Sequence, residues 1–144
     1  MASLDVYGFE DLEDAMRRIS EIPFEVTEKA LDAMASVAAD KIRTQGESMG
    51  VRDPDSDTHI LDKIKRAKAR KTDDGGYENI TFTGSRTRNG ITTRNAEIAF
   101  VNEYGKRGQA ARPFIGLAMT QNETAIQDAA EEVIGDWIER TFQN

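Results

Sequence analysis

The fold of this chain is decided by the stretch from Ile98 to Met119, which has the sequence IAFVNEYGKRGQAARPFIGLAM. Its first part predicts a strand, because apolar and polar positions alternate at period two. The predicted buried face of that strand consists of Ala96, Ile98, Phe100 and Tyr104, with Asn102 as the polar exception. Gly105 is expected to end the strand, since glycine reaches positive φ without steric cost.

The second part of the same stretch predicts a loop followed by a helix. Residues 106–111 are short, basic and contain Gly108, which is typical of a flexible loop. Pro113 suits the first position of a helix, where its missing N–H needs no partner. Arg112 precedes a proline and is therefore expected to be extended. Phe114 begins an apolar stripe, so we expect the C-terminal helix to start here.

Length and composition indicate one ordinary globular domain spanning residues 1–144. The chain is 38% hydrophobic and 31% charged. It has no cysteine, so neither disulfides nor thiol chemistry is available. No apolar run approaches the roughly 18 residues of a membrane span, and the acidic N-terminus MASLDVYGFEDLED has no apolar core of a secretion signal. The net charge of −7 argues against tight, general nucleic-acid binding.

Hydrophobic periodicity on either side of this stretch predicts an α+β fold. We expect a short helix over residues 9–21 and a long, alanine-rich helix over 24–45, with Gly46 and Gly50 marking its end. We expect a C-terminal helix over 113–141 with a break near Thr120–Glu123. Between them, residues 66–104 predict a small antiparallel β-sheet. The predicted architecture packs this sheet against the long N-terminal helix and the C-terminal helix.

Asn89-Gly90 is the strongest hairpin signal in the chain and predicts a type I′ turn. It is expected to join a strand over 77–83 to a strand over 91–103. A strict two-residue turn would, however, place Ile98 on the wrong face of the sheet. We therefore expect either a bulge near Gly84-Ser85 or a longer mobile hairpin over 85–95.

Two groups of basic side chains are candidate contacts for DNA or an acidic partner. The first is a strip formed by Lys63, Lys65, Arg66, Lys68, Arg70 and Lys71, and the second includes Arg86, Arg88 and Arg94. The functional interpretation is a phosphate-contacting surface. The alternative is a solvated face whose lysines prevent edge-to-edge strand pairing. The sequence leaves both open, and a charge-complementary contact between subunits also fits.

No catalytic residue, cofactor site or metal site is predicted. The alternating aspartates of 53–57 suggest a calcium loop, but an EF-hand counted from Asp53 needs glycine and glutamate where Thr58 and Ile64 stand. His59 is the sole histidine, and no partner nucleophile is identifiable, so a surface or capping role is expected. We expect that the protein is not an enzyme.

The residues Val101-Asn102-Glu103-Tyr104-Gly105, followed by a basic loop, Ala111-Arg112-Pro113-Phe114 and Ala118, resemble a bacteriophage family. These are the tail-completion or head–tail joining proteins of long-tailed phages, also called neck or minor tail proteins. Tyr7-Gly8-Phe9, Leu12, a proline and an alanine-rich helix resemble its N-terminal half. The family typically has Thr-Gly-x-Leu where this chain has Thr58-His59-Ile60-Leu61, a departure that puts the family's tight turn in doubt.

The resemblance implies a structural virion protein assembled in the host cytoplasm. Its subunits would form a ring, commonly hexameric, between the head connector and the tail tube or tail terminator, and DNA would pass through the lumen without sequence-specific binding. The structural or interface anchors would be Glu103, Tyr104, Gly105, Arg112, Pro113 and Phe114. An ion pair between Glu103 and Arg112 is a further hypothesis. The alternative function is a module that binds nucleic acid or an acidic partner through the two basic groups.

Overall fold

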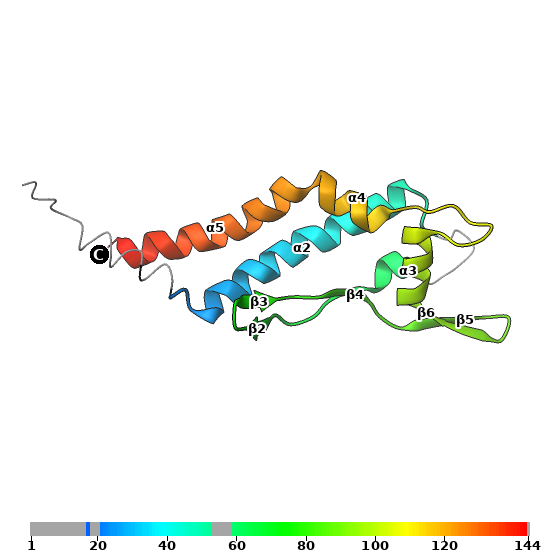
Figure 1. Cartoon of the computed structure of the whole chain (residues 1–144), viewed down its shortest axis with the longest axis horizontal. Helices are drawn as coiled ribbons and strands as arrows, with labels where there is room; N and C mark the ends of the chain where they lie inside the picture. The colour runs from blue at the N-terminus through cyan, green and yellow to red at the C-terminus, as the bar shows by residue number, and fades with distance from the viewer. Residues whose placement is uncertain (1–16, 18–20, 53–58, 144) are drawn as a thin grey trace, which may run out of the picture.

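One long helix, α2 (Phe24–Ser48), runs through the middle of the molecule (Figure 1). The computed structural model describes residues 17, 21–52 and 59–143. The C-terminal helices α4 (Phe114–Gln121) and α5 (Glu123–Phe142) pack along one side of α2. Short strands pack along its other side. The predicted α+β architecture is therefore confirmed.

Small side chains let α2 lie close to the elements on both sides of it. Its buried positions are Ala30, Ala35, Ala38, Ala39, Ile42 and Gly46. The helix continues three residues beyond its predicted end, and Gly50 follows it with a φ of +71°. Gly46 therefore lies inside the helix rather than at its terminus, and there it meets the side chains of Leu61 and Phe114.

The strands form three separate two-stranded antiparallel ribbons rather than one sheet over 66–104. Strand β1 (Ile64–Arg66) pairs with β4 (Ile80–Phe82). Strand β2 (Arg70–Thr72) pairs with β3 (Gly75–Tyr77), and β5 (Ser85–Arg88) pairs with β6 (Ile91–Arg94). The last ribbon projects from one end of the molecule (Figure 1).

The Asn89-Gly90 turn forms as predicted, with φ angles of +52° and +77° that a type I′ turn requires. The strands that it joins were predicted wrongly. The turn connects β5 to β6, whereas β4 pairs with β1 through Ile64 opposite Phe82. Gly84, at a φ of +78°, separates β4 from the hairpin. No bulge is needed, because the segment after β6 leaves the ribbon altogether.

That segment is a helix, α3 (Asn95–Tyr104), so the predicted strand through Ile98 and Phe100 is wrong. The residues that α3 buries are Asn95, Ala99 and Asn102, spaced four and three apart as on one helical face. Over so few residues the sequence fits both the strand period of two and the helical period of 3.6. The helix is decided by tertiary contacts, since the Asn95 side-chain amide donates to the Thr83 carbonyl and its backbone N–H to Gly84.

The core lies where α2, α3 and α4 meet the 3₁₀ helix η1 (Ile60–Lys63) and β4. Leu61 and Phe114 are completely buried there, and Phe114 contacts Phe82 edge-on with ring centroids 6.0 Å apart. Phe114, expected as a structural or interface anchor, therefore lies in the core of the chain. The predicted break in the C-terminal helix is also present, at Asn122 between α4 and α5.

Most of the helix predicted over 9–21 and the aspartate-rich connector 53–57 lie outside the described residues. Within the part of the chain that the structure describes, no helix is long and apolar enough to cross a membrane.

We predict that Gly46→Ala destabilises the protein by about 1–2 kcal/mol, measured by urea unfolding. A Cβ at this position would lie 2.5 Å from Leu61 Cδ2 and 3.1 Å from Phe114 Cδ2, and both of these side chains are completely buried. This overpacking outweighs the roughly 1 kcal/mol by which alanine favours a helix over glycine.

The matched control is Gly135→Ala in α5, where a Cβ meets nothing within 4 Å. It should stabilise the protein by about 0.5–1 kcal/mol through helix propensity alone. Equal effects of the two substitutions would show that the contact at Gly46 is not tight.

Candidate functional site: the α3–α4 corner and its basic cleft

The Glu103 carboxylate, at the end of α3, caps the N-terminus of α4. Its Oε2 accepts a hydrogen bond from the Ile115 N–H and its Oε1 accepts one from the Gly116 N–H, both at 2.8 Å. The first N–H groups of a helix have no partner within it, and the helix dipole favours an anion there. Glu103 therefore fixes the direction in which α4 leaves the loop.

Arg112 ties the same corner to the end of α2. Its Nη1 donates to the Gly50 carbonyl at 2.7 Å, and its backbone N–H donates to the Asn102 carbonyl. The hypothetical ion pair between Glu103 and Arg112 is thus wrong: each of the two side chains bonds to backbone groups instead. The two parts of the motif do meet in space: Glu103 bonds to the first turn of α4, the Arg112 N–H bonds to the Asn102 carbonyl, and Phe114 is completely buried beside them in sequence.

The loop predicted to be flexible closes into a tight turn. Lys106 and Gln109 exchange backbone hydrogen bonds of 3.0 and 2.9 Å, with Gly108 at a φ of +83°. Gly105 has a φ of +77°, as expected, although it ends a helix rather than a strand. A Cβ there would lie 2.9 Å from backbone atoms of Gln109 and Ala111, so glycine allows this close approach.

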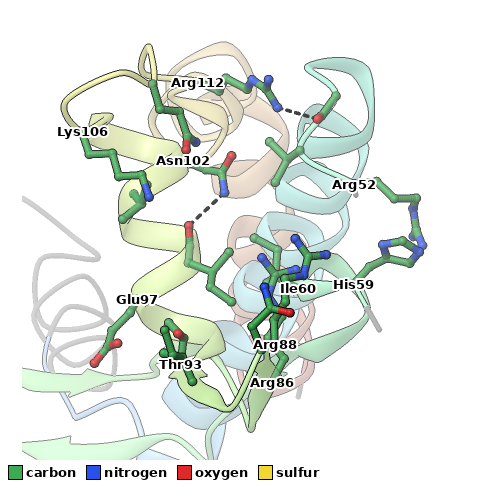
Figure 2. A pocket seen from close by; sticks show the side chains of 17 residues that line it. Arg52, His59, Ile60, Arg86, Arg88, Thr93, Glu97, Asn102, Lys106 and Arg112 are labelled. Carbon is green, nitrogen blue, oxygen red and sulfur yellow. Dashed lines mark hydrogen bonds between the residues drawn. The ribbon is translucent and has the colours of Figure 1, made fainter. Parts of the chain in front are cut away.

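A cleft of about 780 Å³ lies beside this corner. Its walls come from α3, from the β5–β6 hairpin, from the turn at 106–112 and from the chain on either side of the connector (Figure 2). Among the residues that the structure describes, its charged lining comprises five basic side chains, Arg52, Arg86, Arg88, Lys106 and Arg112, and one acidic side chain, Glu97. The described lining is therefore predominantly basic, although the chain carries a net charge of −7.

One of these arginines is held by carboxylates outside the cleft. Arg52 Nη2 lies 3.0 Å from both Glu47 Oε1 and Asp62 Oδ1. The hydrogen bond from Arg52 lowers the pKa of the Asp62 carboxyl, and the same bond raises the pKa of Arg52. At the cleft margin Glu97 pairs with Arg94 at 3.0 Å. The other basic side chains of the lining are Arg86 and Arg88 of the hairpin, Lys106 and Arg112.

His59 and Arg52 both line the cleft (Figure 2). It occupies the N-cap position of η1 but makes no side-chain capping bond. Its buried Nδ1 has no hydrogen-bond partner among the described residues. The expected capping function is therefore not performed by its imidazole.

The other predicted basic group, the strip from Lys63 to Lys71, lies elsewhere, on the last residue of η1, on β1 and β2, and on the connection between these strands. A second groove separates part of the strip from α2. Its charged lining is balanced, with Lys29, Lys65, Arg66 and Lys68 facing Glu25, Glu28, Asp32 and Glu78. Arg66 pairs with Asp32 at 2.7 Å. The structure therefore divides the predicted contact surface in two, and much of the strip faces carboxylates of its own chain.

Two aromatic side chains lie exposed on the outer face of α3. Phe100 is 62% and Tyr104 69% exposed, and their ring centroids are 4.7 Å apart. The sequence prediction placed both on a buried face, which is wrong because the helix turns them outward. Ile91 on β6 is also 69% exposed. The hairpin and α3, which line the basic cleft, therefore also carry exposed apolar side chains.

Several of these residues were not recognised from the sequence. Lys106 was assigned only to a loop, and the contacts of Arg52 with Glu47 and Asp62 span helix α2 and η1. A glutamate shortly before the helix start at Pro113 is a signal for a helix cap. From the sequence, Glu103 is interpreted instead as an ion-pair partner of Arg112.

Within the described residues, no group of three or more histidine, aspartate or glutamate side chains is placed to hold a metal ion. Comparisons with protein-family models, with characterised proteins and with solved structures find no match. The resemblance to phage neck proteins accordingly stays a prediction.

We predict that Glu103→Ala destabilises the protein by about 1–2 kcal/mol, because the first turn of α4 loses its cap. Thermal or urea unfolding measures this cost. Relative to wild type, the hydrogen-exchange rate should increase most at the Ile115 and Gly116 amides, which lose their acceptor. The control is Glu97→Ala on the same helix, whose exposed ion pair should change stability by less than about 0.5 kcal/mol. Equal costs would argue against the cap.

We predict that Glu78→Gln stabilises the protein at neutral pH by about 0.5 kcal/mol or less. Burial, followed by the nearby Asp32 carboxylate, raises the pKa of Glu78 in the folded state. A raised carboxyl pKa means that this group favours folding most below its unfolded pKa and loses that contribution as pH rises through the folded pKa. Unfolding measured from pH 3 to 8 should therefore show the two proteins converging in acid, whereas a less stable variant at neutral pH would contradict the prediction.

Proposed function

We propose that this protein is a structural subunit of a bacteriophage neck, acting in tail completion or head–tail joining. In this proposal copies form a ring, commonly hexameric, between the head connector and the tail tube or terminator. The protein has no catalytic task, and DNA passes through the ring without sequence-specific recognition. Its place is the virion, after assembly in the host cytoplasm. The proposal starts from the motif built around Glu103, Arg112 and Phe114.

The observation that carries the proposal is the exposed pair Phe100 and Tyr104. The two exposed rings contact each other and so form a contiguous apolar patch, and aromatic side chains are enriched in protein–protein contacts. The pair lies on α3, whose last turn also carries the capping Glu103. A rigid corner therefore presents an aromatic surface, which is what a subunit packed between other proteins needs.

The charge of the chain supports passage of DNA rather than its retention. At a net charge of −7, an acidic lumen would repel phosphates, so that DNA slides without adhering. The basic cleft favours the second candidate function, a module that binds nucleic acid or an acidic partner. A steep dependence of DNA affinity on salt would support that candidate.

The test is electron microscopy of lysates from the encoding phage after deletion of this gene. The proposal predicts DNA-filled heads beside separate tails, and restoration of intact particles by the wild-type gene. Phe100→Ser with Tyr104→Ser should fail to restore them, because interface aromatics commonly contribute about 2 kcal/mol or more each. Intact infectious particles without the gene would overturn the proposal.

A matched control separates assembly from folding. Met119→Ser removes another exposed apolar side chain, on α4, and should complement fully. Purified double and control variants should unfold within about 0.5 kcal/mol of wild type, since all three side chains are exposed. A double variant that fails to fold would have to be replaced by the milder Tyr104→Ser alone.

A further inference from the structure

Charge is distributed unevenly along the long axis of the molecule. Residues 85–112, which form the β5–β6 hairpin, α3 and the 106–109 turn, contain six arginines and lysines against two glutamates. Those glutamates are already engaged, Glu97 with Arg94 and Glu103 with the N-terminus of α4. We call this part the basic end.

Helix α5 has the opposite charge. It contains six acidic residues and a single arginine. Four exposed acids, Asp128, Glu132, Asp136 and Glu139, follow one another at spacings of four, four and three residues. At about 100° per residue these positions fall within about 80° of arc, so they form one acidic stripe. Figure 1 shows α5 extending away from the hairpin, toward the opposite end of the molecule.

We propose that the basic end of one copy docks on the acidic stripe of α5 of the next copy. Opposite charges on two different surfaces favour a heterologous, head-to-tail contact, and such contacts close into rings when the rotation between copies permits. Because the two surfaces lie toward opposite ends of an elongated chain, they cannot satisfy each other within one molecule. This inference rests on the proposed ring-forming function and names the surfaces that would build the ring.

Apolar contacts at the basic end complement the charges. Phe100, Tyr104 and Ile91 are exposed among its basic side chains. The contact would then have aromatic anchors at its centre and charged residues around them, which is the usual anatomy of a specific interface. The strip on β1 and β2 is a poorer candidate, since α2 carboxylates of the same chain already face it.

The experiment reverses charge on each surface separately. Variant one carries Asp128→Lys, Glu132→Lys and Asp136→Lys on α5. Variant two carries Arg88→Glu, Lys106→Glu and Arg107→Glu at the basic end. All six side chains are exposed. A control variant, Lys65→Glu with Lys68→Glu and Lys71→Glu, makes the same charge change on the strip.

Sedimentation velocity at low salt, with concentrations raised to the millimolar range, reads out association. Wild type and the control should associate, and added salt should weaken the association. Each reversed variant alone should associate at least about tenfold more weakly than wild type, because both of its contact surfaces then carry charge of the same sign. Mixing variants one and two should restore association, since each contact between a copy of variant one and a copy of variant two joins opposite charges.

Three results would overturn the inference: a wild type that stays monomeric throughout this range, reversed variants that associate like wild type, or a mixture that does not recover. A wild type that stays monomeric but binds duplex DNA, with binding lost in variant two, would instead identify the basic end as a nucleic-acid surface. The outcome is separable from the neck proposal. If deletion of the gene gives separate heads and tails but the charge variants associate like wild type, the neck function is retained and this contact is rejected. If association recovers in the mixture but phage lacking the gene are intact, the contact is retained and the neck function is rejected.

Discussion

The structure depends on the close packing of Leu61 and Phe114 against Gly46 of α2. These two side chains are fully buried, and they come from η1 and α4, segments separated by more than fifty residues. Only a glycine leaves room for both on the helix surface. This contact sets how deeply α4 lies against α2, and the Glu103 cap then sets its direction. The position of α3, and hence of the aromatic pair and the cleft, follows from the same corner.

The long helices could be predicted from the sequence because each repeats its apolar pattern over many turns. The alanines of α2 and the break near Asn122 are such cases. Helix α3 could not, because ten residues are short enough for both a period of two and a period of 3.6 to fit. What decides it is Asn95, whose amide bonds to Thr83 before the chain turns away from the ribbon. Such a tertiary bond has no signature in local periodicity.

The candidate site was predictable in part, because its residues lie close together in the sequence. The motif residues Glu103, Arg112 and Phe114 do meet, because a short turn brings the end of α3 to the start of α4. Their contacts differ from the expected ones: the sequence suggested an ion pair between opposite charges, whereas backbone groups at helix ends compete successfully for both side chains. Phe100 and Tyr104 are exposed because α3 is a helix, which local periodicity did not predict.

The two basic groups look alike in the sequence, yet their surroundings give them different meanings. Beside the strip, Asp32 and three glutamates supply as many negative charges as the groove has positive ones, and this compensation within the chain weakens attraction for any outside anion. In the part of the chain that the structure describes, the lining of the cleft beside α3 contains a single glutamate, which is paired with Arg94. Among the described residues, basic side chains therefore outnumber acidic ones in the lining of the cleft, whereas the two are balanced beside the strip. The proposal of an acidic partner is for that reason better supported at the cleft than at the more densely basic strip.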